Sequence, residues 1–223
     1  METSELRRFD SLYFSIFQLL LKKGLKNLTM DSIASSLGIS KRTLYEKFDS
    51  KTEMVVKTMS FMAKRRRQIS DEIFSKATNS IIALIQTYYI QRSFICNVNQ
   101  NFFDDMDKFF SDIRDYYESE TENEYEFAYS KIKAGISEGV FRSEIDYSIQ
   151  LKTLSLQLES LKRIENRFPQ DISLVDTYDT IYGNFLYSIV TEKGRTILEE
   201  CINNKELIVT DIEKYLYKDE TEF

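Results

Sequence analysis

The stretch that decides the fold runs from residue 28 to residue 51 and reads LTMDSIASSLGISKRTLYEKFDSK. Its apolar spacing predicts two short helices, Met30 to Leu37 and Lys41 to Phe48. The three-residue turn between them contains Gly38, which can adopt the positive φ that a tight turn needs. Two short helices joined by a glycine-containing turn are the arrangement of a helix-turn-helix.

Capping residues mark where each helix should begin. Thr29 and Ser40 stand directly before the two short helices, where a hydroxyl oxygen can accept hydrogen bonds from free backbone amides. Ser50 and Glu53 then have the spacing of a capping box. This box predicts a further, longer helix that begins at Lys51 and runs into the seventies.

A longer helix is also predicted ahead of the pair, from Glu5 to Lys23. Apolar residues recur along it at helical spacing, and these are Phe9, Tyr13, Ile16, Phe17 and Leu20. Gly24 follows two lysines, as is common at the end of a helix. We therefore expect an N-terminal three-helix helix-turn-helix domain over residues 1–50 and a larger helical domain over residues 51–223.

The second short helix carries side chains that can read DNA. Helices of this kind present N-terminal side chains to base edges in the major groove, where arginine and lysine pair with guanine and a threonine methyl contacts thymine. Hydroxyls, lysines and capped amides suit phosphate oxygens, which position a protein without reading sequence. The predicted DNA-binding residues are Thr29, Ser40, Lys41, Arg42, Thr43, Tyr45, Lys47 and Lys51. We expect Lys41, Arg42 and Lys47 to be exposed in the free protein. The alternative is a helix hairpin with ordinary solvated lysines.

The distribution of charge supports a polyanionic partner for the N-terminal part. Residues up to Arg67 hold 14 Lys and Arg against 7 Asp and Glu, a net charge of +7. The remainder of the chain has a net charge of −13, so the two parts sum to the net charge of −6. A basic head on an acidic body favours double-stranded DNA as the partner of the head. Chance clustering of solvated charge is the alternative reading of this feature alone.

The same residues resemble the DNA-binding signature of the TetR family of transcriptional regulators. The characteristic part is Thr43-Leu44-Tyr45, followed by Phe48 and Lys51, and the resemblance covers about the first quarter of the chain. It implies that Thr43 and Tyr45 contact DNA and that Lys51 contacts its backbone. The positions at which the family varies with operator sequence are Lys41, Arg42 and Lys47.

The larger domain contains two helices that are apolar on more than one side, predicted over residues 146–167 and 174–190. Such helices suit a four-helix bundle formed with a symmetry mate, and helix-turn-helix proteins usually bind paired half-sites as dimers. The expected interface residues of this homodimer are Leu151, Leu154, Leu158, Leu161, Tyr178, Ile181, Tyr182, Phe185 and Ile189. Burial of both faces within one subunit is the alternative.

Aromatic residues gather in the segments where the resembled family usually encloses a ligand cavity. Pockets of that kind are mostly apolar with a few placed polar groups. We expect a small hydrophobic or aromatic ligand, and the predicted pocket residues are Tyr88, Tyr89, Phe94, Phe102, Phe103, Phe109, Phe110, Tyr116 and Tyr117. A simple aromatic core is the alternative.

The amino-acid composition excludes most classes of enzyme as the function of this chain. The chain has no histidine, so catalysis by histidine and histidine metal sites are excluded, and Cys96 and Cys201 lie too far apart in sequence for a zinc cluster. No glycine-rich phosphate loop is present. We expect no catalytic residue, no cofactor and no metal. The apolar runs are too short to span a bilayer and the start lacks the features of a signal peptide, so a cytoplasmic protein is expected.

Three classes of function fit these features. The first is a dimeric transcriptional regulator, most often a repressor, that a small molecule releases from its operator. The second has the same architecture but is controlled by a protein partner or acts architecturally, without a small-molecule inducer. The third is an enzyme on a helical bundle with carboxylate metal ligands, which the absence of any histidine disfavours.

Overall fold

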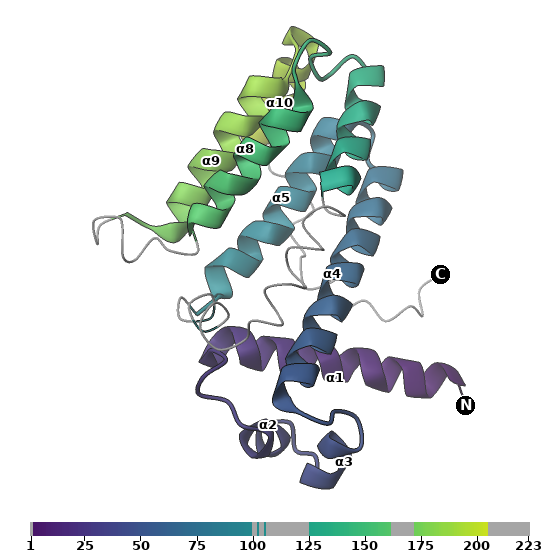
Figure 1. The fold of residues 1–223 in the computed structure, drawn as a ribbon. Coiled ribbons are helices and arrows are strands. Elements are labelled where there is room, and N and C mark those ends of the chain that lie inside the picture. Colours follow the sequence, from purple (N-terminus) through teal and green to yellow (C-terminus); the bar gives the residue numbers. More distant parts are fainter. Residues whose placement is uncertain (1, 100–101, 103–104, 106–124, 162–171, 205–223) are drawn as a thin grey trace. The chain divides into compact units, whose positions relative to one another are not determined.

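The protein is all-α in the computed structural model, which describes residues 2–99, 102, 105, 125–161 and 172–204. Within these ranges the β pairing consists of a single antiparallel bridge between Phe141 and Val190. The predicted fold class, with short helix-turn-helix elements followed by longer helices, is confirmed (Figure 1). The chain divides into two compact units, and each is described by itself.

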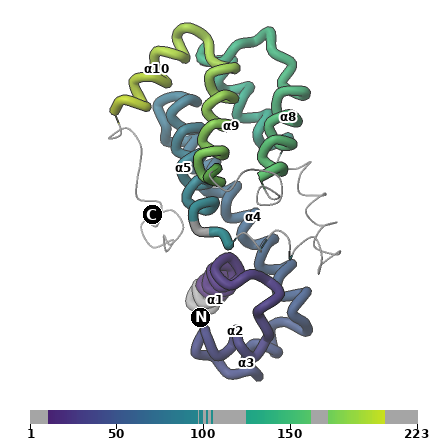
Figure 2. The backbone as a smooth tube through the Cα atoms, turned by 90° about the vertical axis from the view of Figure 1, so that its left-hand side faces the viewer, coloured from purple at the N-terminus to yellow at the C-terminus, as the bar shows by residue number. Residues whose placement is uncertain are grey.

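The first unit comprises, of the described residues, 2–68, 97–99, 102 and 105. Its helices are α1 (Glu2–Lys23), α2 (Met30–Ser36), α3 (Lys41–Tyr45) and the first part of α4 (Lys51–Lys76) (Figure 2). Each helix contributes a fully buried apolar side chain, and these include Leu20, Ile33, Leu44 and Val55. Burying one such side chain stabilises the fold by about 1.5–3 kcal/mol, so the short helices α2 and α3 depend on this core.

In its described residues, the second unit holds the remainder of α4, a helix over residues 125–137 and four further helices. These are α5 (Ser80–Asn97, with Asn97 assigned to the first unit), α8 (Tyr147–Ser160), α9 (Leu174–Ile189) and α10 (Glu192–Asn203). Figures 1 and 2 both show α8 and α9 side by side, and the two helices are in contact. Apolar residues of α5, α8, α9 and α10 form one core cluster, which includes Ile81, Leu151, Phe185 and Leu198.

A short extended pairing joins the turn after residue 137 to the end of α9. The backbone N–H of Arg142 donates to the carbonyl of Ile189 at 2.8 Å, and that of Thr191 donates to the carbonyl of Val140 at 3.0 Å. Gly194 of α10 lies against this turn, and a Cβ at that position would stand 2.2 Å from the Val140 carbonyl oxygen. A residue without a side chain is therefore required for α10 to approach so closely.

The end of the second short helix differs from the prediction, and the end of a later helix is not tested. The second helix of the pair ends at Tyr45 rather than Phe48, because the N–H of Lys47 turns to the carbonyl of Leu44, three residues back, and the helical pattern stops. The helix predicted over residues 146–167 is described only as far as Ser160, and its predicted end lies outside the described residues.

The residues expected at a dimer interface mostly face the interior of their own subunit. Six of them are buried in the core cluster of the second unit, and these are Leu151, Leu161, Tyr178, Tyr182, Phe185 and Ile189. Leu154, Leu158 and Ile181 are partly buried against the same cluster. Ile149 and Leu156 of α8 are instead 63% and 68% exposed. The two-sided apolar pattern thus divides into an inner face, which supplies the core, and an outer face.

Candidate nucleic-acid interface

The helix-turn-helix begins with a reciprocal cap on α2. The backbone N–H of Ser32 donates to Oγ1 of Thr29 at 3.1 Å, and the N–H of Thr29 donates to Oγ of Ser32 at 2.9 Å. This is a capping box in which a serine replaces the usual acidic residue. The predicted capping role of Thr29 is confirmed, and the cap defines where α2 begins.

The turn between α2 and α3 depends on Gly38, which has φ of 64°. Its N–H donates to the carbonyl of Ser35 at 3.2 Å, and the N–H of Ile39 donates to the carbonyl of Ala34 at 3.0 Å. Side chains other than glycine are strained at this φ, so the residue type allows the chain to reverse within three residues.

The turn places Ser40 at the start of α3, where its Oγ accepts a hydrogen bond of 3.0 Å from the N–H of Thr43. Leu44 is fully buried and anchors α3 to the core. The opposite side of the helix therefore faces solvent, and it carries Lys41, Arg42 and Tyr45, all of which are exposed. The predicted exposure of the first two is confirmed. Lys47 is only half-buried rather than exposed, because it follows the end of α3 where the chain turns back to the core.

Two cations of α3 have acidic partners that the sequence analysis did not identify. The Nε of Arg42 donates to Oε1 of Glu46 at 2.8 Å, and the ammonium of Lys41 pairs with the carboxylate of Asp31 on α2. The spacing of four residues between Arg42 and Glu46 could have indicated the first pair. The second pair joins two helices, so only the turn geometry brings it together.

Lys51 lies at the start of α4, behind a cap in which the N–H of Glu53 donates to Oγ of Ser50 at 3.1 Å. Its ammonium donates to the backbone carbonyl of Leu25, in the turn after α1. Burial lowers the pKa of Lys51, and the negative charge of Asp105 partly opposes that change. The lysine expected to contact the DNA backbone is thus half-buried and bound within its own unit in this structure.

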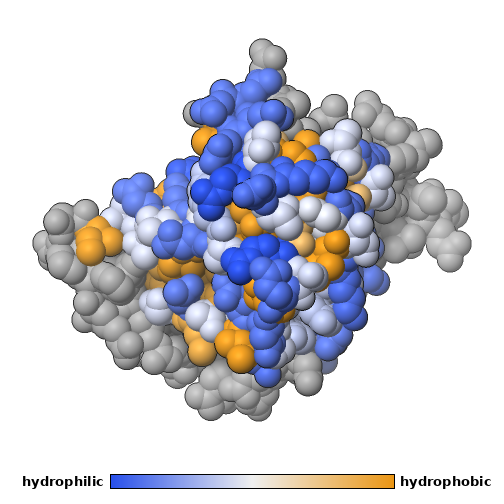
Figure 3. Space-filling view, turned by 90° about the horizontal axis from the view of Figure 1, so that it is seen from above, coloured by the Kyte–Doolittle hydropathy of each residue, from blue (hydrophilic) through white to orange (hydrophobic). Residues whose placement is uncertain are grey.

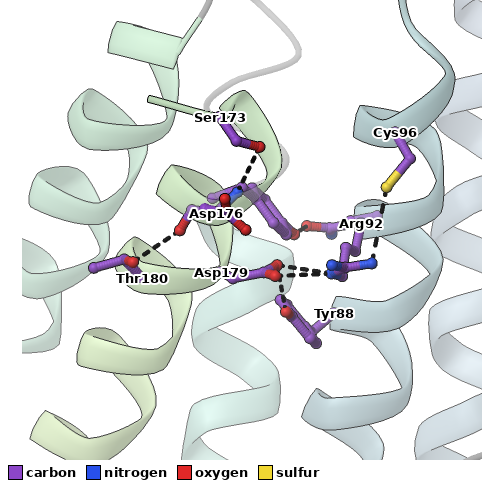
Figure 4. A network of polar contacts seen from close by, with 9 residues as sticks. Tyr88, Arg92, Cys96, Ser173, Asp176, Asp179 and Thr180 are labelled. Carbon is purple, nitrogen blue, oxygen red and sulfur yellow. Dashed lines mark hydrogen bonds and ion pairs between the residues drawn. The ribbon is translucent and has the colours of Figure 1, made fainter. Parts of the chain in front are cut away.

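A second group of polar residues lies in the second unit, on α5 and α9 (Figure 4). The hydroxyl of Tyr88 donates to Oδ1 of Asp179 at 2.6 Å, and Nε of Arg92 donates to Oδ1 and Oδ2 of the same carboxylate at 2.8 and 3.0 Å. The Tyr88 ring stacks on those of Tyr178 and Tyr182 at centroid distances of 5.6 and 4.9 Å. Burial, together with the Asp179 hydrogen bond, raises the pKa of Tyr88, which keeps its hydroxyl a donor.

The structure describes four of the nine residues that were predicted to line a ligand pocket. Tyr88 and Tyr89 meet edge to face at 4.9 Å, and Phe94 lies further along α5. Phe102 is fully buried but belongs to the first unit, so it does not share a unit with these three. The predicted pocket residues Phe103, Phe109, Phe110, Tyr116 and Tyr117 lie outside the described residues.

No helix in the described part of the chain is long and apolar enough to cross a membrane. On the face seen in Figure 3, small hydrophobic areas alternate with hydrophilic residues. A short, capped, basic helix that follows a glycine turn and is anchored to the core by Leu44 is the arrangement of helix-turn-helix proteins, the class that binds duplex DNA.

The sequence of this unit matches a known family of regulatory proteins. A model of the family described as "Bacterial regulatory proteins, tetR family" matches residues 16–58, which span the end of α1, all of α2 and α3 and the start of α4. This part of the chain is therefore similar to the DNA-binding region of the TetR family, and the chain is a DNA-binding transcriptional regulator.

One curated relative and several solved structures are similar to this chain. The HTH-type transcriptional repressor KstR2 of Rhodococcus jostii (strain RHA1) is 29% identical over 142 residues, which are 61% of this chain and 69% of that protein. A transcriptional regulator from Saccharomonospora viridis, solved in complex with choline, has a TM-score of 0.62 and 19% identity over 85% of this chain and 100% of that one. Thermus thermophilus FadR, a TetR-family repressor solved with lauroyl-CoA, has a TM-score of 0.52 and 13% identity over 79% and 93%. At these identities the two structures establish a shared fold.

Proposed function

We propose that this regulator is a homodimeric repressor that a small molecule releases from its operator. The observation that carries the proposal is the exposed basic side of α3, which the Ser40 cap and the buried Leu44 present to solvent. The relative KstR2 is named as a repressor, which supports the direction of regulation. A chromosomal operator would place the protein in the cytoplasm, in a regulatory rather than an enzymatic role.

The roles of the head residues follow from their chemistry. Arg42 and Lys41 contact guanine in the major groove, and the Thr43 methyl contacts thymine. The groups that contact phosphate oxygens are Thr29, Ser40, Tyr45, Lys47 and Lys51. Lys51 must exchange the Leu25 carbonyl for a phosphate to do so.

The dimer forms through the outer face of α8 and its neighbour α9. Ile149 and Leu156 are exposed there, and apolar side chains on an isologous interface pack against the same patch of the partner. Dimerisation places two copies of α3 about 34–36 Å apart, or one DNA turn, so that they enter successive major grooves.

The ligand binds in the second unit, near the tyrosines and the Arg92–Asp179 pair. Aromatic walls with a few placed polar groups are typical of small-molecule sites, and two structures of the same fold hold choline or lauroyl-CoA. A ligand that prefers the conformation with the wrong spacing of α3 helices weakens DNA binding, and the operator weakens ligand binding by the same factor.

The test is selection of duplexes from a random library, followed by footprinting on DNA around the protein's own gene. A palindromic site bound by two chains, as measured by light scattering, is the expected result. Failure to select any sequence at low salt would contradict the proposal. Operator binding that no compound in a metabolite library weakens would instead favour control by a protein partner.

A further inference from the structure

We propose that Glu46 determines the specificity of the DNA-binding helix by positioning Arg42. This inference rests on the proposed function, since it assumes that α3 enters the major groove. The Arg42 and Glu46 side chains are 89% and 59% exposed, and they meet through the Nε–Oε1 hydrogen bond of 2.8 Å. The pair therefore stands on the surface that would face DNA, and it is not part of the core.

The geometry leaves the guanine-binding end of Arg42 available. A guanidinium carries five N–H donors in a planar fork, and the carboxylate of Glu46 accepts from Nε. The two terminal nitrogens can still donate to O6 and N7 of a guanine. Because the carboxylate holds the fork in one orientation, less side-chain freedom is lost when Arg42 binds a base.

The negative charge of Glu46 also discriminates against other sequences. Binding to random DNA relies on contacts with phosphates, and a carboxylate beside Arg42 weakens that attraction. On the operator, Arg42 keeps Glu46 as its partner while it binds the base edge. A free-energy cost that is larger for binding random DNA than for binding the operator increases specificity for the operator.

The second pair in the head shows why Glu46 differs from an ordinary surface acid. Lys41 is paired with Asp31, so two cations of α3 are partly neutralised in the free protein. Asp31, however, belongs to α2, whereas Glu46 follows Arg42 by one helical turn. Glu46, the C-cap of α3, is therefore placed beside Arg42 by the same helical turn.

The test compares Glu46→Gln with Asp49→Asn on three probes. The first probe is the operator selected with the parent protein, the second is a set in which each G·C pair is changed in turn, and the third is a random duplex of equal length. Glu46→Gln keeps the size and an acceptor oxygen but removes the charge. Asp49→Asn changes net charge equally, and the hydrogen bond to Glu53 at Asp49 comes from the backbone amide rather than the carboxylate.

We expect Glu46→Gln to bind the random duplex about fivefold more tightly than the parent. It should lose about tenfold in discrimination at the base pair where Arg42→Ala also loses discrimination. Adding Glu46→Gln to Arg42→Ala should cause no further loss at that pair. Asp49→Asn should leave discrimination at every pair unchanged.

The inference is wrong if Glu46→Gln discriminates like the parent at every pair, if it loses discrimination equally at all pairs, or if its losses add to those of Arg42→Ala. Urea unfolding followed by circular dichroism verifies that each variant is folded. A parent protein that selects no sequence would contradict the proposed function itself, so the two failures are distinguishable.

Discussion

The carboxylate of Asp105 accepts a hydrogen bond of 2.7 Å from the backbone N–H of Lys26, although 79 residues separate them in the chain. The N–H of Asn99 likewise donates to the carbonyl of Leu21 at 2.8 Å. Residues that follow α5 in the chain therefore hold the end of α1 and the turn after it. Among the described residues, the DNA-binding unit combines residues 2–68 with residues that follow α5, and Asp105 is buried where these two parts meet.

We expect Asp105→Ala to destabilise the first unit by about 1–3 kcal/mol, because the partly buried N–H of Lys26 loses its acceptor. Asp105→Asn retains an acceptor oxygen and should cost less. Urea unfolding monitored by circular dichroism measures both changes. If Asp105→Ala unfolds at the same urea concentration as the parent, the hydrogen bond does not stabilise the unit.

Substitutions of the basic residues in the first unit should distinguish contacts with bases from contacts with phosphates. Arg42→Ala should cost about 1–3 kcal/mol of operator affinity and relax specificity at one position, as should Lys41→Ala at another. Lys51→Ala should weaken binding to all sequences and reduce the salt dependence by about one unit of slope. Salt titrations of operator affinity measure both effects. Operator binding by Lys41→Ala and Arg42→Ala that equals the parent's would mean that α3 is not the reading helix.

Gly38 and Gly183 provide a matched pair of substitutions. A Cβ at either position meets no atom within 4 Å, but only Gly38 has a positive φ. Gly38→Ala should therefore destabilise the protein by about 1 kcal/mol through backbone strain, and Gly38→Val by more. Gly183→Ala, in the middle of α9, should stabilise it by up to about 1 kcal/mol because alanine favours the helix. Thermal unfolding measures each change, and equal effects of the two alanines would show that φ is not the cause.

Thr58 of α4 is fully buried, and its hydroxyl has no hydrogen-bond partner among the described residues. Thr58→Val replaces the hydroxyl with a methyl of similar size, so we expect stability to be unchanged or to rise by about 1 kcal/mol. Thr58→Ser keeps the hydroxyl and removes the methyl, and it should destabilise the protein. Urea unfolding of the two variants is the measurement. A less stable Thr58→Val would indicate that the hydroxyl has a partner in solution.

The sequence by itself determined the local structure of the head. Thr29 and Ser40 cap helices because each hydroxyl reaches an amide only three residues further on. Gly38 marks the turn because its backbone accepts a φ of 64°, and the buried Leu44 lies opposite the basic residues of the same short helix. All of these features depend on near neighbours in the chain, so spacing and residue type suffice to predict them.

Only the tertiary structure decided which apolar and charged residues serve which purpose. The helical period on α8 and α9 indicates two apolar faces, but it does not say that Tyr182 and Phe185 pack within the subunit while Leu156 stays on the outer face. Likewise, no local pattern places Asp105 beside Lys26 or Lys51 against Leu25. Contacts between residues far apart in sequence form only when the whole core packs, because burial and charge compensation depend on every surrounding element.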